Sequence, residues 1–332
     1  MATRTALVVL LCGSAAAGVA CTSGEPGAAP PAGGLASKYP GDVGMDRDPA
    51  VVWVENFEEG SVAAVTSRHE QAQNSAGMAL VADVPPRSAG RSSLRLTAGV
   101  SANATDLYKQ LQDHDELFVR WYAKYQPGIH WHHSGVWVGG YNPSSRWPNP
   151  QAGLRPAGDD RLSVSIEPVW GVGGAAPRLD FYNYWMKMHS WMAQPAGNTA
   201  YYGNVLVNQR AFTVDEGQWL CIELHVKLNT DASSSHGAIL EVWKNDALVQ
   251  RFDDGGPLGY WIRDKFCPQG ADGPECTDYP APAEVVLDLQ FRSTQALRLN
   301  AFWPQNYITE GPDGSVQYDD MVVATQRVGC LR

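Results

Sequence analysis

Two neighbouring histidines, His132 and His133, and two tyrosines, Tyr182 and Tyr184, are the residues of this sequence best suited to proton transfer. Histidine titrates near neutral pH, and a tyrosine hydroxyl can give or take a proton where neighbouring cations lower its pKa. We therefore expect one histidine to act as a base and one tyrosine as an acid. The alternative is a polar loop whose histidines only form hydrogen bonds.

The segments around these residues alternate apolar and polar side chains, a period typical of β-strands. Strands are predicted at residues 51–57, 117–125, 162–167, 179–185, 219–228, 238–243, 285–291 and 318–324. A short helix is expected at residues 104–114. This many short strands, separated by Gly, Asn, Asp and Pro turns, predict an all-β fold of two stacked antiparallel sheets, a jelly roll.

Alternation also sorts side chains onto faces of the predicted strands. Three polar faces result, and they carry Arg120, Tyr122 and Lys124, then Ser165 and Glu167, and then Asp180 with Tyr182 and Tyr184. The sequence holds 12 tryptophans and 13 tyrosines, whose rings suit both cores and the apolar faces of sugars. We expect the three faces to form one concave binding surface, and an ordinary solvated face is the alternative.

Charge and the N-terminus indicate the protein's surroundings. The net charge is −10 and no run of Lys or Arg follows the first residues, which argues against a nucleic-acid partner. Residues 1–20 have the basic, apolar and small-residue order of a signal peptide. Cys21 follows as in a bacterial lipoprotein, so we expect lipidation at Cys21, a flexible linker over 21–47, and one domain over 48–332. We expect the mature protein to be a monomer that is exported and held at the outer membrane or cell surface. The alternative is plain secretion.

Four cysteines remain after Cys21, an even number that favours two disulfides in an exported protein. Of the three possible pairings, we expect Cys267–Cys276 and Cys221–Cys330. No CxxC spacing supports a zinc site instead.

Several segments carry a resemblance to a known family. Gly217-Gln-Trp219, residues 225–230 and residues 237–245 resemble the G-x-W, V-x-L-N-T and V-W-x-N/D stretches of family 14 and family 20 polysaccharide lyases. Gly139-Gly140, the tyrosine pair and residues 300–303 and 318–325 follow in the same order, so the resemblance covers residues 50–328. It implies a concanavalin A-like β-jelly roll that acts on alginate, glucuronan or a related acidic, uronate-containing polysaccharide by β-elimination.

The same resemblance exposes two departures. Those lyases have a lysine after the Gly-Gly pair and an S-x-R strand, whereas this sequence has Tyr141 and Glu167 there. We therefore expect a changed catalytic set, with Arg120 or Lys124 holding the uronate carboxylate, His132 or His133 as base, and Tyr182 or Tyr184 as acid. The residues expected to bind substrate are Tyr122, Trp137, Tyr141, Ser165, Glu167 and Asp180.

No cofactor is required for this chemistry, but two metal sites are conceivable. Glu58 and Asp320, beside the first and last predicted strands, could meet and hold a structural calcium ion, because carboxylate oxygens suit Ca²⁺. The alternative is a pair of solvated acidic turns. His130 and His132 would point to one side of an extended segment, as zinc or copper ligands do, but no third ligand is marked.

Two other functions compete with a lyase. Glu167 and Asp180 could serve as the two carboxyl groups of a glycosidase. A non-catalytic carbohydrate-binding or adhesion lipoprotein would instead stack sugars on aromatic residues, namely Trp131, Trp137, Trp147, Tyr182 and Tyr184.

Overall fold

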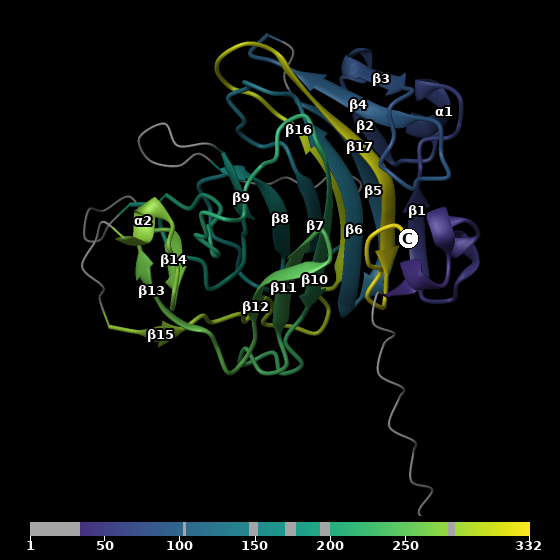
Figure 1. Cartoon of the computed structure of the whole chain (residues 1–332). Coiled ribbons are helices and arrows are strands. Elements are labelled where there is room, and N and C mark those ends of the chain that lie inside the picture. Colours follow the sequence, from purple (N-terminus) through teal and green to yellow (C-terminus); the bar gives the residue numbers. More distant parts are fainter. Residues whose placement is uncertain (1–33, 102–103, 146–151, 170–176, 193–199, 278–282) are drawn as a thin grey trace, which may run out of the picture. The chain divides into compact units, whose positions relative to one another are not determined.

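The computed structural model describes residues 34–101, 104–145, 152–169, 177–192, 200–277 and 283–332. Two large antiparallel sheets dominate these residues (Figure 1), which confirms the predicted all-β jelly roll. The signal segment, Cys21 and Trp147 lie outside the described residues. No helix among the described residues is long and apolar enough to cross a membrane.

The larger sheet has eight strands in the order β12-β11-β10-β6-β17-β4-β3, with β1 paired to β17. Its strands are β1 (Val51–Glu55), β3 (Met78–Val81), β4 (Ser93–Ala98), β6 (Glu116–Tyr125), β10 (Trp219–Lys227), β11 (Ile239–Lys244), β12 (Ala247–Phe252) and β17 (Gly314–Ala324). The pairing of β1 with β17 confirms that the first and last predicted strands meet.

The second sheet has six strands in the order β2-β5-β16-β7-β8-β9. They are β2 (Gln71–Gln73), β5 (Thr105–His114), β7 (Val136–Tyr141), β8 (Arg161–Val169), β9 (Arg178–Phe181) and β16 (Leu299–Asn306). Close packing requires glycine on β7. A Cβ atom on Gly140 would lie 1.7 Å from the carbonyl oxygen of Arg298, a separation no side chain tolerates.

A three-stranded sheet of β13 (Leu258–Ile262), β14 (Lys265–Pro268) and β15 (Val285–Val286) stands apart from the two large ones in Figure 1. The short helix α2 (Pro274–Thr277) follows β14, and the disulfide Cys267–Cys276 joins the two. The second disulfide, Cys221–Cys330, ties the C-terminus to β10. Both predicted disulfides are therefore confirmed.

The core lies between the two large sheets, and alternation along the strands fills it. Val119 and Trp121 of β6 and Val164 and Ile166 of β8 are fully buried in one cluster. Burying side chains of this size stabilises the fold by about 1.5–3 kcal/mol each. Their neighbours on each strand point to the opposite face, as the sequence predicts.

The N-terminal part of the described chain corrects the predicted domain boundary. Residues 34–47 form three 3₁₀ turns, η1 (Leu35–Ser37), η2 (Pro40–Asp42) and η3 (Met45–Arg47). Leu35 and Met45 are buried in one cluster with Val328, and the Leu35 amide donates to the Arg327 carbonyl at 3.0 Å. The prediction that residues 21–47 form a flexible linker is wrong for this part, because its apolar residues pack on the C-terminus.

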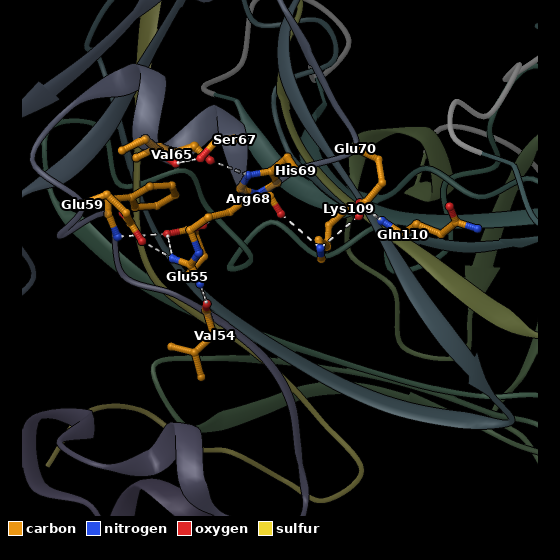
Figure 2. A network of polar contacts seen from close by, with 12 residues as sticks. Val54, Glu55, Glu59, Val65, Ser67, Arg68, His69, Glu70, Lys109 and Gln110 are labelled. Atoms are coloured by element: carbon orange, nitrogen blue, oxygen red, sulfur yellow. Dashed lines mark hydrogen bonds and ion pairs between the residues drawn. The ribbon is translucent and has the colours of Figure 1, made fainter.

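A polar network joins the two large sheets at the edge where the helix α1 (Val62–Ser67) lies (Figure 2). Arg68 pairs with Glu55 of β1 at 2.9 Å and donates to the Val54 carbonyl at 2.8 Å. Lys109 of β5 donates to the Arg68 carbonyl at 3.0 Å and pairs with Glu70 at 3.1 Å. The network therefore fastens β1 of one sheet to β5 of the other.

Two predicted elements are wrong. Residues 105–114 form the strand β5 and not a helix, because β2 and β16 pair with them on both sides. Of the strand predicted at residues 285–291, only Val285–Val286 pairs. One further 3₁₀ turn, η4 (Ser75–Gly77), precedes β3.

Candidate active site

A cleft of about 530 Å³ lies over the β8–β9 side of the six-stranded sheet. Its walls come from the segment before β7, the end of β8, the segments after β9 and β16, and the β13–β14 turn. The lining side chains that bear on chemistry are Trp131, His132, His133, Glu167, Tyr182, Tyr184, Trp191, Tyr202, Asp264, Lys265 and Tyr307. The structure thus brings together both candidate histidines and both candidate tyrosines.

Glu167 and His133 form a dyad at the floor of this cleft. The Nδ1 atom of His133 lies 2.8 Å from Oε1 of Glu167, and the Ser165 hydroxyl donates to Oε2 at 3.4 Å. Glu167 is almost fully buried, and burial raises its pKa although His133 opposes the shift. A carboxylate that accepts a hydrogen bond from Nδ1–H fixes the histidine tautomer. In that tautomer the Nε2 atom carries no proton and can take one from a substrate.

The backbone explains why these groups meet. Glu167 and Ser165 share one face of β8, and the Tyr182 amide donates to the Ser165 carbonyl at 3.0 Å. His133 is held by its amide, which donates to the Tyr307 carbonyl at 3.0 Å. Gly203 leaves room for the Tyr182 ring, because a Cβ atom there would lie 2.3 Å from that ring.

Tyr182 and Tyr184 stand next to the dyad. The ring centres of His133 and Tyr182 are 4.7 Å apart, and the two tyrosine hydroxyls are 3.5 Å apart. Burial raises the pKa of both hydroxyls, so both are protonated at neutral pH. Either hydroxyl can be the donor of this contact, so both tyrosines are candidates for the acid.

His132 and His130 differ from His133. Burial and the neighbouring His133 lower the pKa of His132 to about 4, so His132 is neutral at neutral pH. His130 pairs with Glu310 at 3.0 Å and does not line the cleft. Among the described residues, no group of three or more His, Cys, Asp or Glu side chains is placed to hold a metal ion. The zinc or copper interpretation of the histidines therefore has no support in the described part of the chain.

Arg120, Tyr122 and Lys124 do not belong to this site, which corrects a prediction. They lie on the outer face of β6 in the other sheet: Arg120 is fully buried against Asp42, and Lys124 pairs with Asp83 at 2.7 Å. Alternation shows that the three side chains share a face but not which sheet that face belongs to. Neither cation can hold a substrate in the cleft.

Asp180 is also misassigned, because its carboxylate is used by the backbone. It is fully buried, and it accepts hydrogen bonds from the amides of Leu206, Val207 and Asn208 at 2.8–3.0 Å. Asp180 therefore holds the segment after β9 in place and does not line the cleft. The glycosidase hypothesis, which needs Glu167 and Asp180 as a facing pair, loses one partner.

Three further residues that were predicted to bind substrate do not line the cleft. Trp137 stacks on Trp303 with ring centres 5.5 Å apart and packs edge-on against Tyr182. Tyr141 is buried near the far end of β7, and its amide donates to Asn300 at 3.0 Å. Trp137 and Ser165 support the floor of the cleft, whereas Tyr141 lies at the end of β7 that is remote from it.

Sequence reasoning missed the charged and aromatic residues of the cleft walls. Asp264 comes from the β13–β14 turn, Lys265 begins β14, and Trp191 and Tyr202 come from the segment between β9 and β10. Trp191 is 46% exposed and Tyr202 is 41% exposed, although both are large and apolar. The nearest sequence feature to Lys265 is Cys267, two residues later. This cysteine predicts a disulfide-closed loop but does not indicate where the loop lies in the fold.

Glu58 and Asp320 meet, as predicted, but in a separate pocket of about 300 Å³ on the outer side of β1 and β17. Glu58 Oε1 accepts the amides of Arg91 and Ser92 at 2.6 and 2.7 Å. Asp320 is buried, and its Oδ2 atom has no hydrogen-bond partner. This pair alone falls short of a calcium ligand set, so a structural calcium ion stays a prediction.

Comparison with solved structures places the fold. The alginate lyase Aly36B is 10% identical over 85% of this chain and 96% of its own, with a TM-score of 0.50. The marine PL-14 alginate lyase from Aplysia kurodai is 11% identical over 83% of this chain and 99% of its own, with a TM-score of 0.51. The chain has the fold of an alginate lyase. This agrees with the resemblance to family 14 and family 20 polysaccharide lyases.

An Aly36B variant solved with alginate tetrasaccharide is also similar, at 11% identity over 84% of this chain and 97% of its own, with a TM-score of 0.50. No family model matches the sequence. No curated protein sequence matches it either. At this identity the likeness concerns the fold, and the activity must be argued from the cleft itself.

Proposed function

We propose that this protein cleaves an acidic, uronate-containing polysaccharide by β-elimination in the cleft beside β8. The observation that carries the proposal is the His133–Glu167 dyad, at 2.8 Å, next to two buried and protonated tyrosines. A base oriented by a carboxylate and a neighbouring acid are the two proton-transfer groups that an elimination requires. The alginate lyase fold and the alginate bound to a related structure support a uronate polymer as substrate.

The proposed steps follow from these positions. His133 Nε2 takes the proton from C5 of a uronate residue, and the electrons of that C–H bond form the C4–C5 double bond. The C4–O4 bond breaks, and O4 takes a proton from Tyr184 or Tyr182, which are both protonated at neutral pH. Glu167 stabilises the imidazolium that forms, as buried carboxylates do in other dyads. The contact with Glu167 makes His133 the base, whereas the low pKa of His132, about 4, makes His132 a weak proton acceptor.

A product screen tests this function. The purified protein is incubated with alginate, glucuronan and other polyuronides, and two products are measured: ultraviolet absorbance of the unsaturated uronate, and reducing ends. Elimination yields both signals together, and His133→Ala lowers both by about 10²–10⁴-fold. Reducing ends without ultraviolet absorbance would show hydrolysis and overturn the proposal, as would full activity of the His133→Ala variant.

A non-catalytic sugar-binding role is the second candidate, and one observation favours it. Trp191 and Tyr202 present exposed rings in the cleft, with ring centres 6.3 Å apart. Exposed aromatic faces are the usual platform for sugar rings. Retardation of the protein in gels that contain a polyuronide, without any unsaturated product, would favour this role over catalysis.

We also propose that the protein is exported and anchored by a lipid on Cys21. Two disulfides support export, because such bonds persist in oxidising compartments. Growth with a labelled fatty acid should label the wild type and leave Cys21→Ala unlabelled. Label on the Cys21→Ala variant would contradict lipidation at that position.

A further inference from the structure

A uronate carboxylate needs a positive partner, and neither cation predicted from the sequence reaches the cleft. Tyr141 and Glu167 stand where the lyases of the resemblance carry lysine and arginine, while Arg120 and Lys124 lie on the other sheet. Without such a partner, burying a carboxylate beside Glu167 would be strongly unfavourable. The cleft must therefore obtain positive charge from another element if it takes an acidic sugar.

Resting on the proposed function, we propose that Lys265 on β14 is the residue that recognises the substrate carboxylate and makes the cleft selective for uronates. Lys265 lines the same cleft as His133 and Tyr184, and its side chain is 31% exposed. Among the described residues that line the cleft, Lys265 is the only lysine or arginine. An ammonium group at a partly desolvated wall forms a charge-assisted hydrogen bond with a carboxylate.

Backbone contacts hold Lys265 against the cleft. Lys265 pairs with Val205 in a parallel bridge, and the Phe266 amide donates to the Val205 carbonyl at 2.8 Å. Val205 itself lines the cleft. The disulfide Cys267–Cys276 then staples β14 to α2. Lys265 is therefore fixed on a braced strand and not carried by a free loop, which reduces the entropy lost on binding.

Lys265 shares its ion-pair partner, Glu275, with a second cation. Its Nζ atom lies 3.2 Å from Oε1 of Glu275, whose Oε2 atom is 2.7 Å from Arg178. One carboxylate thus faces two cations, and Glu275 and Arg178 are both buried. Although burial opposes ionisation, Arg178 and Lys265 lower the pKa of Glu275, so two cations share this one carboxylate. Glu275 therefore compensates Lys265 only in part, and an incoming carboxylate can form a further ion pair with it.

Asp264 is the opposing charge at the same wall. It lines the cleft next to Lys265 and is buried, and burial raises its pKa while Lys265 opposes the shift. A charged Asp264 repels a uronate, so its removal should have the opposite effect from the removal of Lys265. Trp191, by contrast, offers an uncharged ring face and should contribute equally to acidic and neutral sugars. These three residues therefore separate charge recognition from sugar stacking.

The test measures binding by calorimetry with two probes, an oligomannuronate tetrasaccharide and its carboxyl-reduced, neutral counterpart. All proteins carry His133→Ala, so that the probe is not consumed. Lys265→Met should weaken binding of the acidic probe about tenfold and leave the neutral probe unchanged. Asp264→Asn should tighten binding of the acidic probe alone, Trp191→Ala should weaken both probes equally, and Lys265→Arg should retain most of the acidic preference.

The outcomes are distinct. Equal loss of both probes in Lys265→Met, an unchanged acidic preference, or no binding of the acidic probe by the parent would overturn the assignment of Lys265. Selective loss supports it even if the wild type releases no unsaturated product, in which case only the elimination mechanism fails. Thermal unfolding of each variant, expected within a few degrees of the parent, shows that the fold is retained.

Discussion

Replacing Glu167 by glutamine removes the negative charge of the dyad and keeps the shape of the side chain. Glutamine fills nearly the same volume and can still accept the Nδ1 proton of His133, but it carries no charge to stabilise the imidazolium. General-base catalysis contributes about 10²–10⁴ in rate, and this change removes the orienting charge while leaving the imidazole itself. We therefore expect kcat to fall by about 10²-fold, or about 2.7 kcal/mol of activation free energy.

The assay follows unsaturated product on the best polyuronide from the screen, for Glu167→Gln, His133→Ala and the double variant. Because the two residues act as a unit, the double variant should be no slower than His133→Ala alone. Stability supplies the control. Burial raises the pKa of Glu167, so glutamine should leave the unfolding midpoint unchanged or higher. Ser165→Ala, which removes two long contacts of 3.3 and 3.4 Å, should cost much less activity.

Two results would refute this reasoning. Independent losses, with the double variant slower than either single variant by the product of their effects, would show that Glu167 does not act through His133. A Glu167→Gln variant with the wild-type kcat would show that the carboxylate is only structural.

Three further predictions concern stability and metal binding. Replacing both Cys221 and Cys330 by serine, which opens a loop with a sequence separation of 109, should lower the free energy of unfolding by about 5 kcal/mol, measured by chemical denaturation; an equal stability would show that the C-terminus is held by packing alone. Burial raises the pKa of Glu55 to about 7, so the folded state binds this proton more tightly than the unfolded chain, and the stability it contributes is lost as pH rises from about 4.5 to 7. Between pH 4.5 and 7, the free energy of unfolding of Glu55→Gln should change by about 3 kcal/mol less than that of the wild type. Identical pH profiles for the two proteins would contradict the raised pKa. Calcium should raise the unfolding midpoint of protein dialysed against a chelator, and Asp320→Asn should abolish the rise; no shift in the wild type would exclude the structural calcium ion.

The sequence predicted those parts of the fold that depend on local pattern. Alternating segments predicted eight of the 17 described strands, β15 only in part, and the even cysteine count led to both disulfides. Strand β5 was missed because Asp106 and Tyr108 are buried along with Leu107, which hides the period of two in a strand that pairs on both sides. Residues 34–47 were missed because a composition rich in Gly and Asp does not reveal the few apolar residues that anchor them.

The site was predictable only where one strand or its neighbour carried it. Ser165 and Glu167 share β8, and Tyr182 and Tyr184 extend the next strand, so alternation and order were enough to group them. Arg120 was misplaced because a polar face looks the same on either sheet. Lys265 was invisible because its position depends on a bridge to Val205, some sixty residues earlier, and no local pattern encodes such a contact.

The departures from the lyase pattern change the charge of the cleft floor. At Glu167 a negative group replaces the arginine that the resemblance implies, and that group is buried and paired with His133. A histidine held by a carboxylate is a better base than an isolated one, so the change adds proton-transfer capacity while removing positive charge from the floor. A cation on the cleft wall, such as Lys265, would restore the charge that the floor has lost. The dyad and the wall cation are therefore complementary changes, and a variant that carries arginine at position 167 should no longer depend on Lys265 for binding acidic sugars.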